Sequence, residues 1–527
     1  MQHVGHLCIM TLTRVSHFLT GITVLLIAGM LLAGAQGCQR QPWDSNPEHM
    51  LRLSADTLFF DTVFATVGSV TLPLKLYNDH DASLWVEDLQ LVDGSSSAYR
   101  INVNGMAVED LSVPVPALSL LPGDSMYVFV EVTVNPNSGA GATPFWVRDE
   151  LTFVTNGNLQ EVKLLARGQN AVFHGSPNQY NTLACDEVWT AELPHVIYGR
   201  ILVDPGCTLT ILPGAQVYAH DGSGIWVRGG TMVADGSLDA PILFRGDRLE
   251  DSYANTPGQW GLSFEITDTL SGSLVNFSAF RGGIWLDRAV NCVFDHIDLR
   301  QATVGVWVDS VGTDAEYALQ LTNSILSNME SIGLLSQSGH IEGFNNLISN
   351  CGQACGYFAL GGNLQIHLST FANFSTQGSG LRQYPTVYLN DWYEAANGSI
   401  QMRPFSGDTE FRNCVVAGNN ASLNEFSEFI VDLRDPGVYL DPLWTSSAVQ
   451  HQMETFPDNI LDNQTSVNIA PPFVNVFEED FRLETSATSW LGTSSTPPYS
   501  PFEVGTDLAG EPRSTIAPTK GCYERVN

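Results

Sequence analysis

The sequence predicts an all-β protein, in which a sandwich of antiparallel strands precedes a parallel β-helix, a solenoid of stacked coils. Three observations support this prediction. Short alternating segments separated by turn residues fill residues 51–171. From residue 172 onward, short β segments recur with a period of about 22 residues. Apolar residues make up 44% of the 527 residues and charged residues only 15%, which excludes a disordered chain and a coiled coil.

The first 37 residues have the pattern of an export signal. Arg14 precedes an uncharged, leucine-rich run over residues 15–34, and small residues follow it. The alternatives are a plain signal peptide without lipidation and an uncleaved anchor, which also needs about 20 apolar residues. Ala35-Gln36-Gly37-Cys38 resembles a bacterial lipobox, although Gln36 stands where a small residue is usual. The resemblance implies a signal peptide over 1–37, lipidation of Cys38, a linker over 38–50, and anchoring to the outer membrane of the cell envelope, facing the periplasm or the surface.

Residues 51–171 carry the signals of an antiparallel sandwich. Met126–Val134 alternates between apolar and polar residues, and Asn156-Gly157 is a typical hairpin turn. The region also resembles Ig-like modules of the abnormal-spindle/hydin type. The matching features are the strand that ends at Asn78, the Pro-Gly-Asp-Ser turn from Pro122, and the Leu-Ala-Arg-Gly close at 165–168. The resemblance implies a spacer or interaction domain.

A glycine-led motif marks the coils of residues 172–470. It occurs at Gly224-Ile-Trp226, Gly283-Ile-Trp285, Gly305-Val-Trp307, Gly333-Leu-Leu335 and Gly356-Tyr-Phe358. The period is shared by leucine-rich repeats, but their Leu-x-x-Leu-x-Leu frame is absent, so a parallel β-helix fits better. Asparagines at turn positions, such as Asn323 and Asn345, are expected to bond to their neighbours in the next coil.

Two stretches resemble a known family. Val196–Val217, followed by Gly230–Phe244, resembles the N-terminal coils of right-handed parallel β-helix repeat proteins. Residues 471–527 resemble the closing segment of bacterial surface proteins of that family, at Asp480–Leu483, Asp507–Arg513 and Gly521–Glu524. The resemblance implies a pectin lyase-like fold, so the expected fold class is a right-handed parallel β-helix solenoid preceded by an Ig-like β-sandwich. This family hosts lyases, hydrolases and non-enzymes, so it specifies no activity.

The tryptophans of the repeated motif suggest a binding surface. Each lies between two aliphatic residues, so alternation along a strand turns the aliphatic residues inward and the tryptophan outward. Stacked coils would then align Trp226, Trp285 and Trp307, with Leu335 and Phe358 continuing the column. The charged residues that should lie beside it are Arg228, Asp287 and Asp309. Flat rings next to charged groups suit sugars, and the alternative is a covered ridge that forms a second core.

Catalytic signals are weak. If Asp295–Arg300 forms one strand, then His296, Asp298 and Arg300 share its outer face, where they are either catalytic candidates or a solvated row. The chain contains no Asp-Asp dipeptide and no Gly-His-Gly, and the single lysine after residue 172 is Lys520. The leading hypothesis is a non-enzymatic surface protein that binds glycan or a partner. A polysaccharide lyase or glycosidase and a structural spacer are the alternatives.

The charge and the cysteines restrict partners and cofactors. Acidic residues outnumber basic ones 56 to 23, and this excludes nucleic acid as a partner. The seven cysteines after Cys38 are expected to be small core residues, because an odd number over this length is not a disulfide scaffold. No cofactor or metal is expected beyond weak Ca²⁺ binding at Asp247–Asp251 or Asp432–Asp435. The expected partners are a polysaccharide or surface protein, and the membrane through Cys38.

Overall fold

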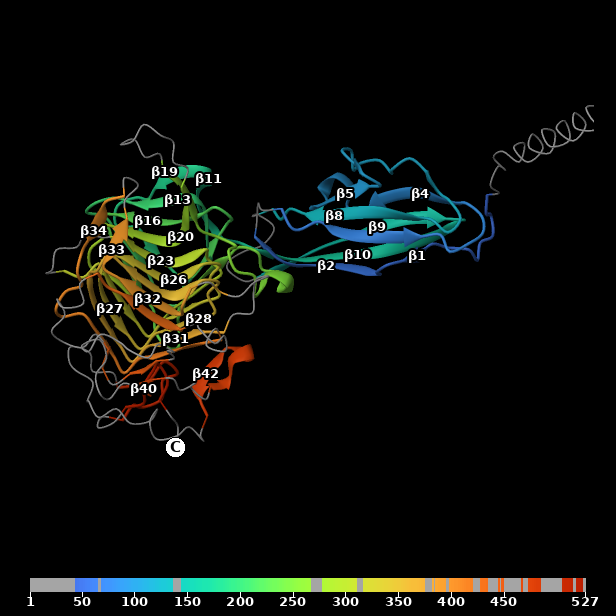
Figure 1. Ribbon diagram of the computed structural model, residues 1–527. Coiled ribbons are helices and arrows are strands. Elements are labelled where there is room, and N and C mark those ends of the chain that lie inside the picture. The colour runs from blue at the N-terminus through green and yellow to red at the C-terminus, as the bar shows by residue number, and fades with distance from the viewer. Residues whose placement is uncertain are drawn as a thin grey trace, which may run out of the picture. The chain divides into compact units, whose positions relative to one another are not determined.

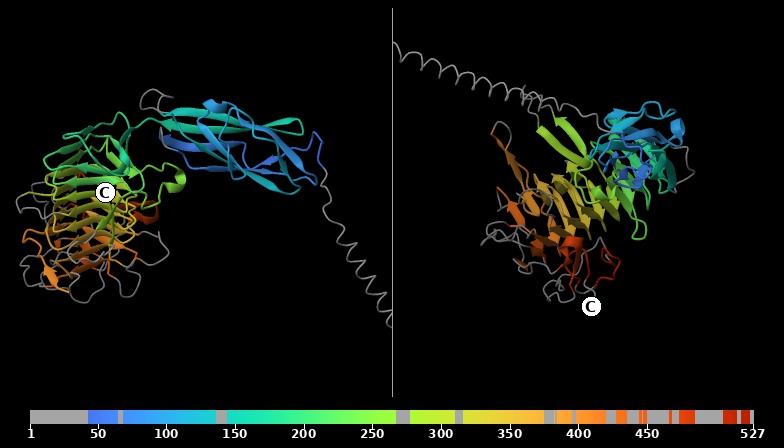
Figure 2. Two further views of the ribbon diagram at one scale, coloured as in Figure 1. Left: turned by 90° about the horizontal axis from the view of Figure 1, so that it is seen from above. Right: turned by 90° about the vertical axis from the view of Figure 1, so that its right-hand side faces the viewer.

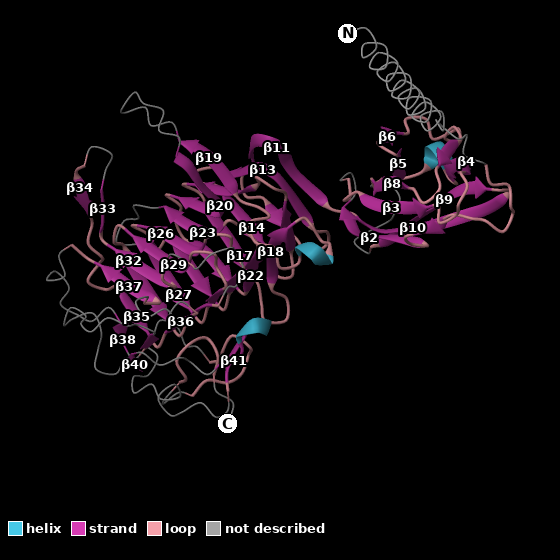
Figure 3. Cartoon of the chain, turned by 45° about the vertical axis from the view of Figure 1, so that its right-hand side comes forward, coloured by secondary structure: helices cyan, strands magenta, loops and turns pink. Residues whose placement is uncertain are grey.

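A computed structural model (Figure 1) describes residues 43–64, 68–135, 144–266, 277–309, 316–374, 382, 384–394, 398–419, 427–434, 444–445, 447–449, 466–467, 473–484, 505–514 and 518–524. The chain divides into two compact units, residues 1–135 with 146–167 and residues 136–145 with 168–527. The signal pattern and Cys38 lie outside the described residues. Within the described part, no helix has the length and apolar character needed to cross a membrane. Strands dominate, joined by loops and a few short 3₁₀ helices (Figure 3).

The first unit consists of two five-stranded sheets, in the orders β1-β3-β8-β5-β6 and β2-β10-β9-β4-β7. Its elements are β1 (Arg52–Leu53), β2 (Thr57–Phe64), β3 (Leu72–Tyr77), β4 (Leu84–Leu91), η1 (Gly94–Ser96), β5 (Tyr99–Val103), β6 (Met106–Ala107), β7 (Leu118–Leu120), β8 (Ser125–Val132), β9 (Phe145–Thr155) and β10 (Asn158–Gln169). The antiparallel sandwich predicted for this region is confirmed.

Alternation along the strands builds the core of the sandwich. In β8, Val128 and Val130 are fully buried, whereas Tyr127 and Phe129 between them face outward. The β9–β10 hairpin turns at Asn156 and Gly157, which have φ values of 51° and 80°. Two consecutive positive φ values are what a tight type I′ hairpin turn requires, and asparagine followed by glycine adopts them at the least cost.

The second unit is a solenoid of parallel strands (Figure 2). Its elements are β11 (Val172–Thr182), β12 (Val188–Trp189), β13 (His195–Val203), β14 (Thr208–Ile211), β15 (Gln216–Ala219), β16 (Gly224–Arg228), β17 (Thr231–Asp235), β18 (Ile242–Gly246), η3 (Asp251–Tyr253), β19 (Leu262–Ile266), β20 (Phe277–Asp287), β21 (Cys292–Asp295), β22 (Ile297–Arg300), β23 (Val304–Asp309), β24 (Leu319–Thr322), β25 (Ile325–Ser327), β26 (Ile332–Gln337), β27 (His340–Phe344), β28 (Leu347–Ser349), β29 (Ala354–Ala359), β30 (Asn363–His367), β31 (Thr370–Asn373), β32 (Val387–Asn390), β33 (Trp392–Glu394), β34 (Ile400–Met402), β35 (Glu410–Arg412), β36 (Val415–Gly418), β37 (Phe429–Asp432), β38 (Trp444–Thr445), β39 (Ala448–Val449), β40 (Ser466–Val467), β41 (Phe473–Asn475), η6 (Val476–Glu478) and β42 (Asp480–Leu483).

Three ladders run along the solenoid. One pairs β16, β20, β23, β26, β29, β32 and β37 in turn. Figure 1 shows several of these strands one after another along the stack. A second runs from β15 through β18, β22, β25, β28, β31 and β36 to β39 and β40, and the third runs from β12 to β38. Each coil therefore contributes one short strand to each ladder, and this confirms the predicted parallel β-helix.

Stacked aliphatic residues and asparagine corners hold the coils together. Ile225, Ile284 and Val306 lie in register on successive coils and are fully buried. Asn323 and Asn345 adopt left-handed φ values of 47° and 58° at one corner. The Asn345 side-chain amide donates to Asn323 Oδ1 across coils at 2.8 Å. The bonding between coils expected of these asparagines is confirmed.

The structure corrects two sequence expectations. Phe358 was expected to continue the column after Leu335, but the residue in register with Leu335 is Tyr357. Phe358 points into the core, where it is fully buried. The glycine-led alignment is wrong there by one residue, because Gly356 pairs with Leu334 and not with Gly333. The expectation that all cysteines are core fillers is also wrong, since Cys185 and Cys207 form a disulfide. The other five after Cys38 are buried and free: Cys292, Cys351, Cys355, Cys414 and Cys522.

Candidate functional site

A row of stacked aromatic rings lies on the outer face of the parallel strands β16, β20 and β23. The rings of Trp226 and Trp285 have centroids 4.6 Å apart at 14°, and those of Trp285 and Trp307 are 4.9 Å apart at 15°. Leu335 and Tyr357 follow in register. Tyr388 on the next coil stacks on Tyr357 at 5.0 Å. We call these six residues the aromatic ladder. The predicted column of three tryptophans is confirmed.

Exposure varies along the aromatic ladder. Trp307 is only 6% exposed and Leu335 only 3%, and both pack with Val304 and Ile332 in a small apolar cluster outside the main core. Trp226 and Trp285 are partly exposed. Because neighbouring rings stack face to face, the faces of the inner tryptophans contact one another and not solvent. The middle of the ladder is therefore a covered second core, whereas Trp226 at one end and Tyr357 and Tyr388 at the other are partly exposed.

Tyr180 extends the Trp226 end of the aromatic ladder. It comes from β11, is 56% exposed, and lies tilted against Trp226 with ring centroids 6.1 Å apart. The guanidinium of Arg200 lies 4.6 Å from the Tyr180 ring centroid, and that of Arg228 lies 5.6 Å from the Trp226 ring centroid. Sequence reasoning missed Tyr180, because β11 lies outside the glycine-led motif.

Charged side chains follow the ladder as predicted. Arg228, Asp287 and Asp309 lie in register on three successive coils. Trp226 Nε1 donates to Asp287 Oδ2 at 3.2 Å, and Arg288 Nε donates to Asp287 Oδ1 at 2.9 Å. Burial, helped by the charge of Asp287, raises the pKa of Asp309. The face thus combines an aromatic edge, the guanidinium groups of Arg200, Arg228 and Arg288, and two neighbouring carboxylates.

The candidates at Asp295–Arg300 do not form one row. The strand is interrupted at His296, which has a φ of 47° between β21 and β22, so the expected alternation through His296 is wrong. His296 Nδ1 lies 3.0 Å from Asp295 Oδ2. Asp298 and Arg300 do share a face and form an ion pair at 2.6 Å. Arg300 also lies 3.7 Å from Glu479, next to η6.

Two proposed calcium loops have carboxylates with protein partners. Asp247 Oδ2 lies 2.7 Å from His220 Nδ1, and the Tyr388 hydroxyl donates to Asp432 Oδ2 at 3.0 Å. Asp435 lies outside the described residues. Lys520, the single lysine of this region, is buried and donates to the Ser447 carbonyl at 3.1 Å. A buried amine bonded to backbone is not placed to act as the base of a lyase.

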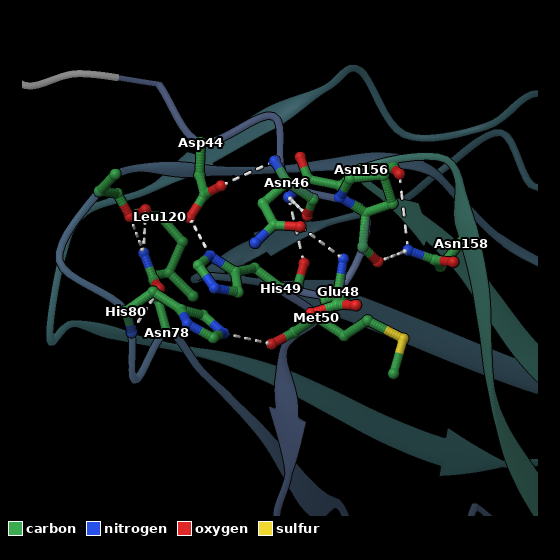
Figure 4. A network of polar contacts seen from close by, with 12 residues as sticks. Asp44, Asn46, Glu48, His49, Met50, Asn78, His80, Leu120, Asn156 and Asn158 are labelled. Carbon is green, nitrogen blue, oxygen red and sulfur yellow. Dashed lines mark hydrogen bonds and ion pairs between the residues drawn. The ribbon is translucent and has the colours of Figure 1, made fainter.

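Sequence reasoning also missed a polar cluster in the first unit (Figure 4). Asp44, His49 and His80 place potential metal-ligand atoms within 4.8 Å of one another. Asp44 Oδ2 lies 2.6 Å from His49 Nδ1, and the two imidazoles stack with centroids 4.1 Å apart. His80 Nε2 lies 3.1 Å from the Met50 carbonyl oxygen. These contacts fasten residues 44–50 to the sandwich.

Asparagine side chains reinforce that attachment. The side-chain amide of Asn156 donates to the carbonyls of Asn46 and His49, and that of Asn158 donates to Pro47. The hairpin turn therefore also holds the N-terminal segment. A local sequence pattern could not predict this cluster, because Asp44 and His49 come from the N-terminal segment, whereas His80 and the two asparagines come from later turns of the sandwich.

The fold defines a parallel β-helix protein, and comparisons add only remote similarity. No protein-family model and no curated protein match the chain. The Agl-KA catalytic domain is similar with a TM-score of 0.27 and 11% identity, over 75% of each chain. The A-module of the Azotobacter vinelandii mannuronan C-5 epimerase AlgE4 gives 0.27 and 12%, over 58% of this chain and 82% of its own. The periplasmic chaperone SfaE gives 0.16 and 13%, over 23% of this chain and 58% of its own. None of these similarities assigns an activity to the chain.

Proposed function

We propose that the protein is a lipid-anchored binding protein of the bacterial cell envelope, with an Ig-like module before the β-helix, and that its ligand is a polysaccharide. The signal pattern and the lipobox at Cys38 support export and anchoring. The binding surface is the Trp226 end of the aromatic ladder, which the exposed ring of Tyr180 extends.

The observation that carries the proposal is the combination of groups at that end. Tyr180 is exposed by 56% and offers an apolar ring to the C–H face of a sugar. Arg200 and Arg228 lie over the neighbouring rings and can donate to hydroxyl groups. Asp287 and Asp204 are acceptors in the same area, the latter already bonded to Arg228 at 2.7 Å. A rigid ladder pre-organises these groups, which lowers the entropic cost of binding.

Affinity electrophoresis of the purified protein through gels containing different polysaccharides tests this proposal. At least one polysaccharide should retard the protein, and a Tyr180→Ala/Trp226→Ala variant should lose most of the retardation. Tyr127→Ala removes an exposed ring from the other unit and serves as the matched control. Equal retardation of all three proteins, or no retardation by any polysaccharide, would contradict the assigned surface.

A second candidate function, a polysaccharide-active enzyme, is favoured by one observation. Asp287 and Asp309 lie in register on adjacent coils, and the raised pKa of Asp309 suits a proton donor beside a second carboxylate. Product release from a retarding polysaccharide, abolished by Asp309→Asn, would support this candidate. Retardation without product release would favour the binding protein.

A further inference from the structure

A second surface with binding chemistry lies on the sandwich, on the outer face of β2, β10 and β9. It consists of Phe59, Trp146, Arg148, Lys163 and Arg167, which we call the basic patch. Trp146 is 48% exposed and Phe59 is 50% exposed, with ring centroids 6.2 Å apart. In β10, alternation turns Lys163 and Arg167 outward, while their neighbours Val162, Leu164 and Ala166 are fully buried.

Positive charge is concentrated on this patch. Residues 43–167 contain six lysines and arginines, and three of them lie here, the others being Arg52, Lys75 and Arg100. Arg52 pairs with Asp79, and Arg100 donates to the backbone carbonyls of Ser97 and Tyr99. Across the part of the chain that the structure describes, Arg148, Lys163 and Arg167 form no ion pair with a carboxylate.

The cations surround the exposed indole. The guanidinium carbons of Arg148 and Arg167 lie 5.7 and 5.2 Å from the Trp146 ring centroid. Arg148 and Lys163 also line a hollow of about 540 Å³, together with Trp146 and Glu150. Asp149 at its wall is already engaged, since it accepts hydrogen bonds from Ser97 Oγ and the Asp93 amide. The hollow thus offers an aromatic ring, two cationic side chains and, besides the engaged Asp149, the carboxylates of Asp93 and Glu150.

We propose that the basic patch binds an acidic polysaccharide through a uronate residue. The sugar ring lies on Trp146, and Arg148, Lys163 and Arg167 hold its carboxylate. Arg148 and Arg167 flank Trp146 and favour an anionic group on its ring, and charge-assisted hydrogen bonds to their guanidinium groups favour a carboxylate. The large exposed ring together with Glu150 as an acceptor for hydroxyls selects a sugar over an acidic peptide. The net charge of −33 does not prevent this, because charges beyond about 8 Å are screened at physiological ionic strength.

Calorimetric titration of the purified protein with a hexamer of galacturonate tests the proposal. We expect saturable binding that weakens as NaCl rises from about 50 to 150 mM. Arg148→Gln/Lys163→Gln should weaken the affinity for the hexamer at least tenfold. Trp146→Ala should weaken it to a similar extent, and Trp146→Phe, which keeps an aromatic ring, should weaken it less. Arg52→Gln/Lys75→Gln is the matched control, because it removes the same two positive charges from the other sheet, where Arg52 and Lys75 lie over the Tyr77 ring.

Three results would overturn the proposal. The first is absence of binding to the hexamer, and the second is equal binding of its carboxyl-reduced form. The third is displacement of the hexamer by poly-glutamate of matched charge, which would make the patch a general anion site. All substituted side chains lie on the surface, and circular dichroism verifies that each variant is folded. To keep the two proposals distinguishable, the titration is repeated in a Tyr180→Ala/Trp226→Ala background, where Arg148→Gln/Lys163→Gln should still weaken uronate binding at least tenfold.

Discussion

Trp226 and Trp285 stack with ring centroids 4.6 Å apart because the parallel register of β16 and β20 sets them directly opposite each other. The chain between them forms β17, β18 and β19 before it returns to the same ladder. Side-chain stacking and backbone pairing therefore support the same alignment of coils. Single changes along the ladder should differ in effect according to how much of each ring is buried.

Trp307 should be the ladder residue most important for stability. It is 6% exposed and packs in a cluster with Val304, Ile332 and Leu335. Trp307→Ala should lower the free energy of unfolding by about 3 kcal/mol, through lost burial and the cavity left behind. Guanidinium denaturation followed by circular dichroism measures this. Tyr127→Ala, at a residue 41% exposed, should change it far less, and an equal loss would mean that Trp307 is not a core residue.

The ion pair between Arg382 and Glu428 should show a strong asymmetry between single and double variants. The side chains are 5% and 0% exposed, Arg382 donates to Glu428 Oε2 at 2.8 Å, and Thr386 Oγ1 donates to the same oxygen at 2.7 Å. Arg382→Met leaves a buried carboxylate without its cation and should cost about 3–5 kcal/mol. Arg382→Met/Glu428→Met should restore much of that loss. Thermal unfolding of the two variants measures the difference. A double variant that is less stable than Arg382→Met alone would contradict the expectation.

His174 should make the protein sensitive to acid. Burial lowers its pKa from 6.5 to about 4, and the neighbouring His195 adds to the shift. Trp189 stacks on it at 4.4 Å, and Glu187 lies 3.3 Å from its Nδ1. Because the unfolded state binds the proton more tightly, stability should fall as the pH drops below about 6.5 and should level off near 4. His174→Gln should flatten this part of a plot of thermal midpoint against pH.

His220 provides the matched comparison for that experiment. Its hydrogen bond to Asp247 raises its pKa above 6.5. Its protonated form therefore stabilises the fold at low pH, and the contribution is lost as the pH rises through the raised pKa. His220→Gln should lower the thermal midpoint most at low pH. The same pH dependence in both variants would contradict the opposite signs assigned to the two histidines.

The disulfide between Cys185 and Cys207 should stabilise the first coils. The two residues are separated by 22 positions, and closing a loop of that length contributes about 3 kcal/mol in the chain-entropy description. A reducing agent, or Cys185→Ser/Cys207→Ser, should therefore lower the thermal midpoint of this unit. Cys292→Ser serves as the control, because Cys292 takes no part in the bridge and burial raises the pKa of its thiol to about 12, which keeps it unreactive. The effect of reduction on the thermal midpoint should be the same in this variant. An unchanged midpoint on reduction would show that the first coils do not depend on the bridge.

Local sequence patterns were sufficient for the strands and the coil repeat. Alternation depends on residues two positions apart, so Trp226, Trp285 and Trp307 could be placed on an outer face without coordinates. The Asn-Gly hairpin turn and the corner asparagines followed from the few residue types that accept positive φ. These features are local, and their physical cause is visible in a short window of residues.

Pairings between distant segments could not be predicted in this way. The structure places Tyr357 in the column where the sequence predicted Phe358, a difference of one residue in register. A shift of one residue turns a side chain from the outer face to the core, and this register is set by hydrogen bonding between coils. His296 left its expected row because a corner falls at that residue.

By itself the sequence therefore determined the all-β class, the stacking of coils and the chemistry available on their outer face. The tertiary structure decided which of that chemistry is accessible. It buried Trp307, brought Tyr180 to Trp226, and gathered Arg148, Lys163 and Arg167 around Trp146. The reason is that exposure and proximity depend on how separate strands pair and pack, whereas alternation and turn preference belong to each strand alone.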